Sequence, residues 1–165
     1  LFNQIRHDSL TGLYNRIGLQ ERIEKMLSHP GSQGVLLMID VDNFKQLNDR
    51  YGHVYGDQFL RSFGLNLTQV LPQDVIAGRM GGDEFIVFYP RNVPERTIAD
   101  FSRRVAGILE EISPEESPVF PVTCSIGVAY ADERATFTDL YRNADKALYV
   151  RKKSGKRGFC LLNEK

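Results

Sequence analysis

A short, unbroken apolar segment, Val35 to Ile39, ends at Asp40. Apolar residues without alternation over this length are typical of a strand that is buried on both faces of a sheet. Such a strand needs other elements against both of its faces. The segment is also far shorter than the roughly 20 residues that a helix needs to cross a bilayer. It therefore favours a sheet at the centre of the domain and argues against a membrane span.

The rest of the chain alternates between helical and strand-like patterns. Apolar residues recur at helical spacing in longer segments at 15–28, 55–70, 94–112 and 137–153. A short helix is expected over 43–48, with Asp42 or Asn43 as its N-cap. Strands are expected over 75–80, 84–89 and 119–130, the last broken or bulged near Gly127, with an edge strand over 159–162. This order predicts one domain of the α/β (α+β) class, with a mixed central sheet and flanking helices.

Length and charge narrow the class of protein. The chain has 165 residues, the size of one domain, and its 21 Lys and Arg residues balance 21 Asp and Glu residues. That balance argues against a strongly basic nucleic-acid binder. The two cysteines are too few for a disulfide scaffold, which favours a reducing compartment. No signal peptide is visible and the first residue is not Met, so we expect a longer protein, with 1–7 as the end of an upstream linker and 8–165 as the domain.

Acidic residues stand at the ends of two expected strands. Asp40 closes the first strand, with Asp42 two residues on, and Asp83 and Glu84 begin the second strand of a hairpin. Successive strand residues face opposite sides, so only one of Asp83 and Glu84 can point toward Asp40. Converging carboxylates without His or Cys favour Mg²⁺ or Mn²⁺ over zinc. The spacing leaves open the alternative that these acids are helix caps and turn residues.

Four sequence blocks carry a resemblance to a known family. Gly81 and Gly82 link two expected strands, and glycine readily adopts the positive φ that tight hairpin turns need. Residues 81–85 read GGDEF. The other blocks are DSLTGLYNR at 8–16, DVDNFK at 40–45 with the pairs ND, GH and GD shortly after it, and ADKALY at 144–149. They run in order over essentially the whole chain, which therefore resembles a GGDEF-domain diguanylate cyclase.

The resemblance implies an activity and an assembly. Such enzymes condense two GTP molecules into cyclic di-GMP and release two pyrophosphates, the 3′-hydroxyl of each GTP attacking the α-phosphate of the other. The implied fold is a ferredoxin-like palm, similar to the palm of nucleotide cyclases and polymerases. Two domains must face each other across a two-fold axis, so a homodimer is expected. The resemblance implies a cytoplasmic domain that follows a sensor domain in the full-length protein. Whether the full-length protein is anchored in the membrane is left open. The domain itself is expected to contact neither nucleic acid nor membrane.

The resemblance also implies roles for the strand-end residues. Asp40 and Asp83 would bind a pair of Mg²⁺ or Mn²⁺ ions through their carboxylates, and Val41 through its backbone carbonyl. Asp83 matches the proton acceptor, and Glu84 helps with the second metal. Lys45 matches the position that stabilises charge on the phosphates, although it is otherwise an ordinary solvated helix lysine.

Further positions match contacts with the nucleotide. Asn48 and Asp57 match a guanine-reading pair, because a carboxylate accepts from the N1–H and N2 amino donors that adenine lacks; such sites discriminate by about 10⁴ or more. His53 matches another substrate contact, but a His after Gly is also common in turns. Lys152 and Lys156 match a Lys and an Arg on the β- and γ-phosphates.

Lys156 departs from the family pattern. It stands where Arg is more usual, and a lysine keeps the charge without the bidentate fork. Arg157 is the alternative residue for this contact. Without the resemblance, these cations would be a solvated helix end.

The inhibitory motif of the family is absent. Counting back from Gly81, Pro72 and Val75 occupy the Arg and Asp positions of the RxxD motif, and neither offers charge. Asp74 is one residue out of register, and no Arg lies between Arg61 and Arg79 to pair with it. We therefore expect weak or absent product feedback.

Two other functions compete with an active diguanylate cyclase. The first is a catalytically inactive GTP-binding regulatory module, but the signature is intact here. The second is a cyclase that makes another cyclic dinucleotide, which Asp57 disfavours because relatives that accept ATP tend to lose this acid.

Overall fold

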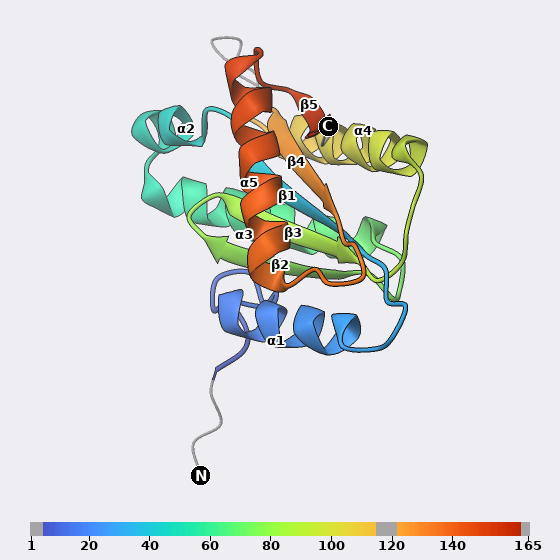
Figure 1. Cartoon of the computed structure of the whole chain (residues 1–165). Helices are drawn as coiled ribbons and strands as arrows, with labels where there is room; N and C mark the ends of the chain where they lie inside the picture. Colours follow the sequence, from blue (N-terminus) through green and yellow to red (C-terminus); the bar gives the residue numbers. More distant parts are fainter. Residues whose placement is uncertain (1–4, 115–121, 163–165) are drawn as a thin grey trace.

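Helices and strands alternate along residues 5–114 and 122–162, the part of the chain that this computed structural model describes (Figure 1). In order, the elements are α1 (Arg16–Leu27), β1 (Val35–Val41), α2 (Phe44–Tyr51), α3 (His53–Val70), β2 (Ile76–Gly81), β3 (Glu84–Tyr89), α4 (Glu95–Ile112), β4 (Cys124–Tyr130), α5 (Phe137–Lys153) and β5 (Gly158–Leu161). Over those described residues, five strands form one sheet in the order β2-β3-β1-β4-β5. The mixed sheet that the sequence predicts is confirmed.

β1 is the central strand and is buried on both faces, as its apolar sequence predicts. It pairs antiparallel with β3 on one side and with β4 on the other, and β5 then runs parallel to β4. One face of β1 contributes Leu37 and Ile39 to a core with α3 and α4. The other face contributes Leu36 and Met38 to a core with α1 and α5. Figure 1 shows α5 crossing one face of the sheet while α3 and α4 lie behind it.

Gly127 is not a bulge, and that expectation is wrong. β4 is continuous, with Gly127 opposite Met38 of β1 and Cys160 of β5. A Cβ atom on Gly127 would lie 2.0 Å from the carbonyl oxygen of Ala144 and 2.5 Å from the backbone nitrogen of Leu148. The glycine therefore lets α5 pack directly on the backbone of β4.

Helix boundaries differ from the sequence pattern around Gly52. α2 continues to Tyr51 and α3 begins at His53, so the two helices are separated by Gly52 alone, with φ 90°. Asn43 occupies the N-cap position of α2 with φ 63°, but its side chain makes no capping hydrogen bond. The expected strand over 119–130 begins at Cys124, and its residues 119–121 lie outside the described residues.

The hairpin between β2 and β3 turns at Gly81 and Gly82, as predicted. Their φ angles are 141° and 50°, a region that L side chains rarely adopt. The register shifts between Arg79 and Gly81, just before the turn. In the described part of the chain, no helix is both long and apolar enough to cross a membrane.

Candidate active site

Asp40 and Glu84 are cross-strand partners. The register of β1 and β3 places their Cα atoms opposite each other, and both continue the series of positions that face α1 and α5. Side chains at directly opposite positions have Cβ atoms about 4.5–5.5 Å apart. Of the two acids in the signature, Glu84 is therefore the one beside Asp40.

Asp83 lies at the start of the same hairpin strand but contacts β1 differently. Its carbonyl oxygen accepts a hydrogen bond from the backbone N–H of Val41, at 3.4 Å. Burial raises the pKa of the Asp83 carboxyl, and the nearby Asp42 carboxylate adds to the rise. Asp83 thus lies next to Asp42 and the end of β1, while Glu84 lies next to Asp40.

Asp42 is a buried acid whose oxygens are already bonded. Its side chain accepts hydrogen bonds from the Thr123 hydroxyl at 2.6 Å and from the Ser125 hydroxyl at 2.7 Å. The backbone N–H of Arg157 also donates to it, at 3.4 Å. These bonds join the end of β1 to β4 and to the loop after α5. They give Asp42 a structural role, and of the two N-cap candidates it is Asn43 that occupies the position.

Lys152 reaches the strand-end acids from α5. Its ammonium group donates to the Asp40 carboxylate. The side chain of Lys152 is 40% exposed and that of Asp40 is 16% exposed. Burial lowers the pKa of Lys152, and the charge of Lys156 adds to that effect. A cation thus lies on the carboxylate that the resemblance assigns to metal.

The loop after α5 brings Lys156 to the same end of the sheet. Its ammonium group lies 3.1 Å from the side-chain oxygen of Asn43. Lys156 and Arg157 both have positive φ, 61° and 55°, so the loop turns sharply here. Whether Lys156 or Arg157 contacts a phosphate stays a prediction.

The donor set at the strand end suits magnesium. Across residues 5–114 and 122–162, no three His, Cys, Asp or Glu side chains gather closely enough to hold a metal by themselves. Mg²⁺ is usually held by one or two carboxylates together with waters and substrate phosphates. Asp40 and Glu84, which lie opposite each other on β1 and β3, fit that pattern and leave the remaining ligand positions to a triphosphate.

Asn48 has a buried oxygen without a partner. In the described part of the chain, nothing donates to its side-chain Oδ1. A Cβ atom on Gly56 of α3 would lie 1.7 Å from this oxygen, so Gly56 makes the room for it. The next residue, Asp57, is exposed. The α2–α3 unit therefore holds Asn48 against Gly56, one residue before Asp57, and leaves one buried acceptor without a partner.

Lys45 and His53 lie on the same α2–α3 unit. Lys45 is in the first turn of α2, and His53 is the first residue of α3. Both side chains are exposed. Their substrate contacts stay predictions.

Tyr141 is a residue of the site that the sequence did not reveal. Its hydroxyl donates to the Glu84 carboxylate at 2.7 Å, and the Arg16 guanidinium lies 4.9 Å from the centre of its ring. Burial and the bond to Glu84 raise the pKa of Tyr141 to about 12. No sequence signal marks Tyr141, because its contact depends on how α5 crosses the sheet.

Arg79 is a second unanticipated residue. It donates at 2.9 Å to the Asp8 carboxylate and at 2.9 Å to the carbonyl oxygen of Gly82, in the signature turn. Burial opposes ionisation of Asp8, but hydrogen bonds from Thr11 and the charge of Arg79 hold its pKa below the usual value. Arg79 therefore connects the segment 8–13 to the turn at Gly81 and Gly82 by hydrogen bonds.

The positions of the inhibitory motif carry no ion pair of their own. Pro72 and Val75 line an apolar-edged cavity of about 320 Å³ beside β2. Asp74 pairs with Arg91, which follows β3 and lies beyond the stretch between Arg61 and Arg79. Absence of the RxxD site stays a prediction.

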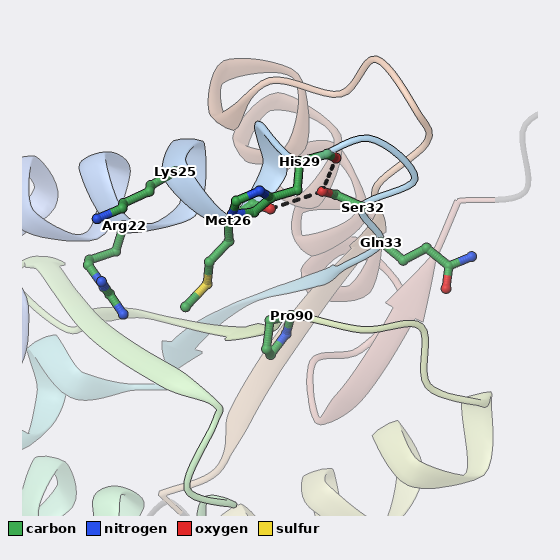
Figure 2. Close-up of a pocket in the computed structure, with 7 residues that line it drawn as sticks. All are labelled: Arg22, Lys25, Met26, His29, Ser32, Gln33 and Pro90. Carbon is green, nitrogen blue, oxygen red and sulfur yellow. Dashed lines mark hydrogen bonds between the residues drawn. The ribbon is translucent and has the colours of Figure 1, made fainter.

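Another cavity, of about 450 Å³, lies where α1 leads into β1, next to Pro90 (Figure 2). Arg22, Lys25 and His29 line it, and the Ser32 hydroxyl there donates to backbone carbonyls of Met26 and His29. It adjoins the first residues of β1, whereas Asp40 is near the last; at about 3.3 Å per residue the two places are about 17 Å apart. This cavity is separate from the strand-end site.

Comparisons with known proteins agree on one family. The family model described as "Diguanylate cyclase, GGDEF domain" matches residues 5–158. The chain is 36% identical over 168 residues to diguanylate cyclase DgcS of Shewanella oneidensis, covering 96% of this chain and 53% of that protein. It is 35% identical over 159 residues to cyclic di-GMP phosphodiesterase PdeR of Escherichia coli, covering 94% of this chain and 24% of that protein. The chain thus spans about half of one relative and about a quarter of the other.

A solved structure supports the fold. The GGDEF domain of DgcB from Caulobacter crescentus, in complex with c-di-GMP, superposes with a TM-score of 0.85 and covers 98% of both chains. Its sequence identity to this chain is 24%. The likeness therefore concerns the architecture, which is that of this GGDEF domain.

Proposed function

The chain belongs to the GGDEF domain family of diguanylate cyclases, and from that premise we propose that it condenses two GTP molecules into cyclic di-GMP, releasing two pyrophosphates. The observation that carries the proposal is the intact signature turn, which sets Glu84 opposite Asp40 and Asp83 beside the end of β1. Paired carboxylates at one strand end are what metal-assisted phosphoryl transfer requires of a protein.

The acids would hold the metal. Asp40, Asp83 and Glu84 offer carboxylate oxygens, and Val41 offers a backbone carbonyl at the same strand end. When bound, Mg²⁺ or Mn²⁺ neutralises the triphosphate and polarises the attacking 3′-hydroxyl. Asp83 accepts the proton of that hydroxyl.

The lysines of the α5 end hold the triphosphate. Lys152 bonds to Asp40 and Lys156 to Asn43, so both ammonium groups already lie at the strand end. Lys152 would leave Asp40 where that carboxylate holds a metal, and its ammonium group would then bind the phosphates. Lys45, on the neighbouring helix, adds positive charge as the negative charge on the phosphates grows.

The α2–α3 unit reads the base. The Oδ1 of Asn48, which is buried without a partner, would turn toward the base and accept a hydrogen bond from guanine, and the Asp57 carboxylate would accept from the guanine N1–H and N2 amino group. Leaving a buried acceptor without a partner is costly, so guanine gains affinity by satisfying it. Adenine offers neither donor, which excludes ATP. His53, the exposed first residue of α3, provides a further contact with the substrate.

Catalysis requires two copies of the domain. Each domain binds one GTP, and the two nucleotides must meet across a two-fold axis. A homodimer, organised by a sensor segment upstream, is therefore part of the proposal. The isolated chain should be a weak enzyme whose specific activity rises with concentration.

A regulatory module that binds GTP without turning it over is the second candidate. The match to a region of a protein named as a phosphodiesterase favours it, because a cyclase-like domain there accompanies another activity.

One assay separates the two candidates. The chain is fused to a dimeric coiled coil and incubated with GTP and Mg²⁺, while cyclic di-GMP is followed by chromatography and GTP binding by calorimetry. Product from GTP and none from ATP supports the cyclase. GTP binding without any product, at every fusion register tried, would replace the cyclase with the regulatory module.

A further inference from the structure

Tyr141 is bonded to an acid of the active site, yet none of the four family blocks contains it. Its hydroxyl donates to Oε1 of Glu84 at 2.7 Å, and no other hydrogen bond of this hydroxyl is found within residues 5–114 and 122–162. A phenylalanine would fill the same space, so packing alone does not account for the hydroxyl. The bond to Glu84 is the function that the structure gives it.

The ring of Tyr141 is held from two sides. Phe137, one turn earlier on α5, lies with its ring centre 5.9 Å away, and the guanidinium of Arg16 lies 4.9 Å from the ring centre. These contacts restrain the ring of Tyr141, and a restrained hydroxyl can orient a flexible carboxylate that bonds to it.

α5 reaches both members of the carboxylate pair, by different residues. Tyr141 bonds to Glu84 and Lys152 bonds to Asp40, about three helical turns or 16 Å apart along the axis. The two contacts differ in kind. Lys152 would have to leave Asp40 for that carboxylate to hold a metal, whereas a hydroxyl that donates to one oxygen of Glu84 leaves the second oxygen available to a metal.

We propose that Tyr141 is a positioning residue for the metal site: its hydroxyl orients the Glu84 carboxylate so that the second oxygen binds the cation beside Asp40. The inference rests on the proposed function, because it takes Glu84 as a metal ligand. It differs from a role in folding, since the hydroxyl can be removed while the ring stays.

The test measures Mn²⁺ binding directly. The chain is titrated with Mn²⁺ in the presence of a non-hydrolysable GTP analogue, and free Mn²⁺ is followed by electron paramagnetic resonance. Tyr141→Phe keeps the ring contacts, and its Mn²⁺ dissociation constant should rise about tenfold, the loss expected for one hydrogen bond to a charged group. Affinity for the analogue itself, measured without metal, should not change.

Matched variants separate positioning from general damage. Tyr149→Phe is the control on the same helix, because that side chain is 63% exposed, and it should leave Mn²⁺ binding as in the unmodified chain. In a Glu84→Ala background, Tyr141→Phe should have no further effect, since nothing is left to orient.

Three results would overturn the inference. Unchanged or tighter Mn²⁺ binding by Tyr141→Phe would show that the hydroxyl does not orient a ligand. An equal loss in Tyr149→Phe would show a general effect of the helix, and an undiminished loss in the Glu84→Ala background would show action through another residue. Failure of the proposed function looks different, because then the unmodified chain itself neither makes cyclic di-GMP nor binds Mn²⁺ with the analogue.

Discussion

Replacing Gly56 by Ala should separate nucleotide binding from stability. The added Cβ would lie 1.7 Å from Oδ1 of Asn48, about half of an ordinary contact distance, and 2.9 Å from Cγ of the same side chain, whereas the nearest atom of any other residue, in the Phe44 ring, would be 3.3 Å away. The carboxamide of Asn48 is a flexible side-chain end and must move by more than an ångström. It then no longer presents its acceptor where the guanine donors meet it.

The magnitude follows from one displaced hydrogen bond. Losing it costs about 1.4 kcal/mol, so the GTP dissociation constant should rise about tenfold. Stability should change little or increase, because an alanine inside a helix is favoured over glycine by about 1 kcal/mol. Calorimetric titration with GTP and thermal unfolding of the same sample measure both quantities.

Gly107→Ala is the matched control. Gly107 also lies in a helix, α4, and a Cβ there would have no atom within 4 Å. This variant should gain stability and keep the GTP affinity of the unmodified chain. If Gly56→Ala bound GTP as tightly as Gly107→Ala, Asn48 would not contact the base and the guanine assignment would be wrong.

Three further perturbations test other parts of the structure. Gly127→Ala should lower the free energy of unfolding by about 1–3 kcal/mol, because its Cβ meets the backbone of α5; chemical denaturation showing no loss would contradict the close packing of α5 on β4. Hydrogen bonds from Thr11 and the charge of Arg79 lower the pKa of Asp8, so its ionised carboxylate stabilises the fold above its ordinary pKa of 3.8, and that stabilisation is lost as the pH falls through the lower folded-state pKa. Asp8→Asn should therefore lose less stability than the unmodified chain between pH 5 and pH 3, and equal losses in urea titrations would show that these contacts do not stabilise the ionised form. Cyclic di-GMP added to the active enzyme should inhibit weakly or not at all, and tight noncompetitive inhibition would reveal a product site that does not use Pro72 and Val75.

Local sequence patterns predicted most helices and strands. The alternation of side chains between the two faces of a strand predicted part of the acidic site. The glycine pair between two β-rich segments marks a hairpin whatever surrounds it, and β3 runs from Glu84 to Tyr89 as expected. Alternation along a strand also shows that only one of two adjacent acids can face Asp40. Which one it is depends on the register between β1 and β3, and only the folded sheet fixes that register.

Long-range contacts account for what the sequence could not reveal. Gly127 in a strand indicates either a bulge or a close approach, and only the docking of α5 decides between them. Asp42 resembles a helix cap locally, but its oxygens bond to Thr123 and Ser125 of a distant strand segment. Tyr141 acts 57 positions away from Glu84 in the sequence, so no spacing rule could have paired them.

The mass balance of the reaction tests the central claim most directly. The dimeric fusion is supplied with GTP and Mg²⁺, and GTP, pyrophosphate and cyclic di-GMP are quantified in the same samples, with Asp83→Ala in parallel. The account predicts that two GTP disappear and two pyrophosphates form for each cyclic di-GMP, and that folded Asp83→Ala forms none. Release of inorganic phosphate with GDP, or equal cyclic di-GMP from Asp83→Ala, would contradict a cyclase centred on this strand end.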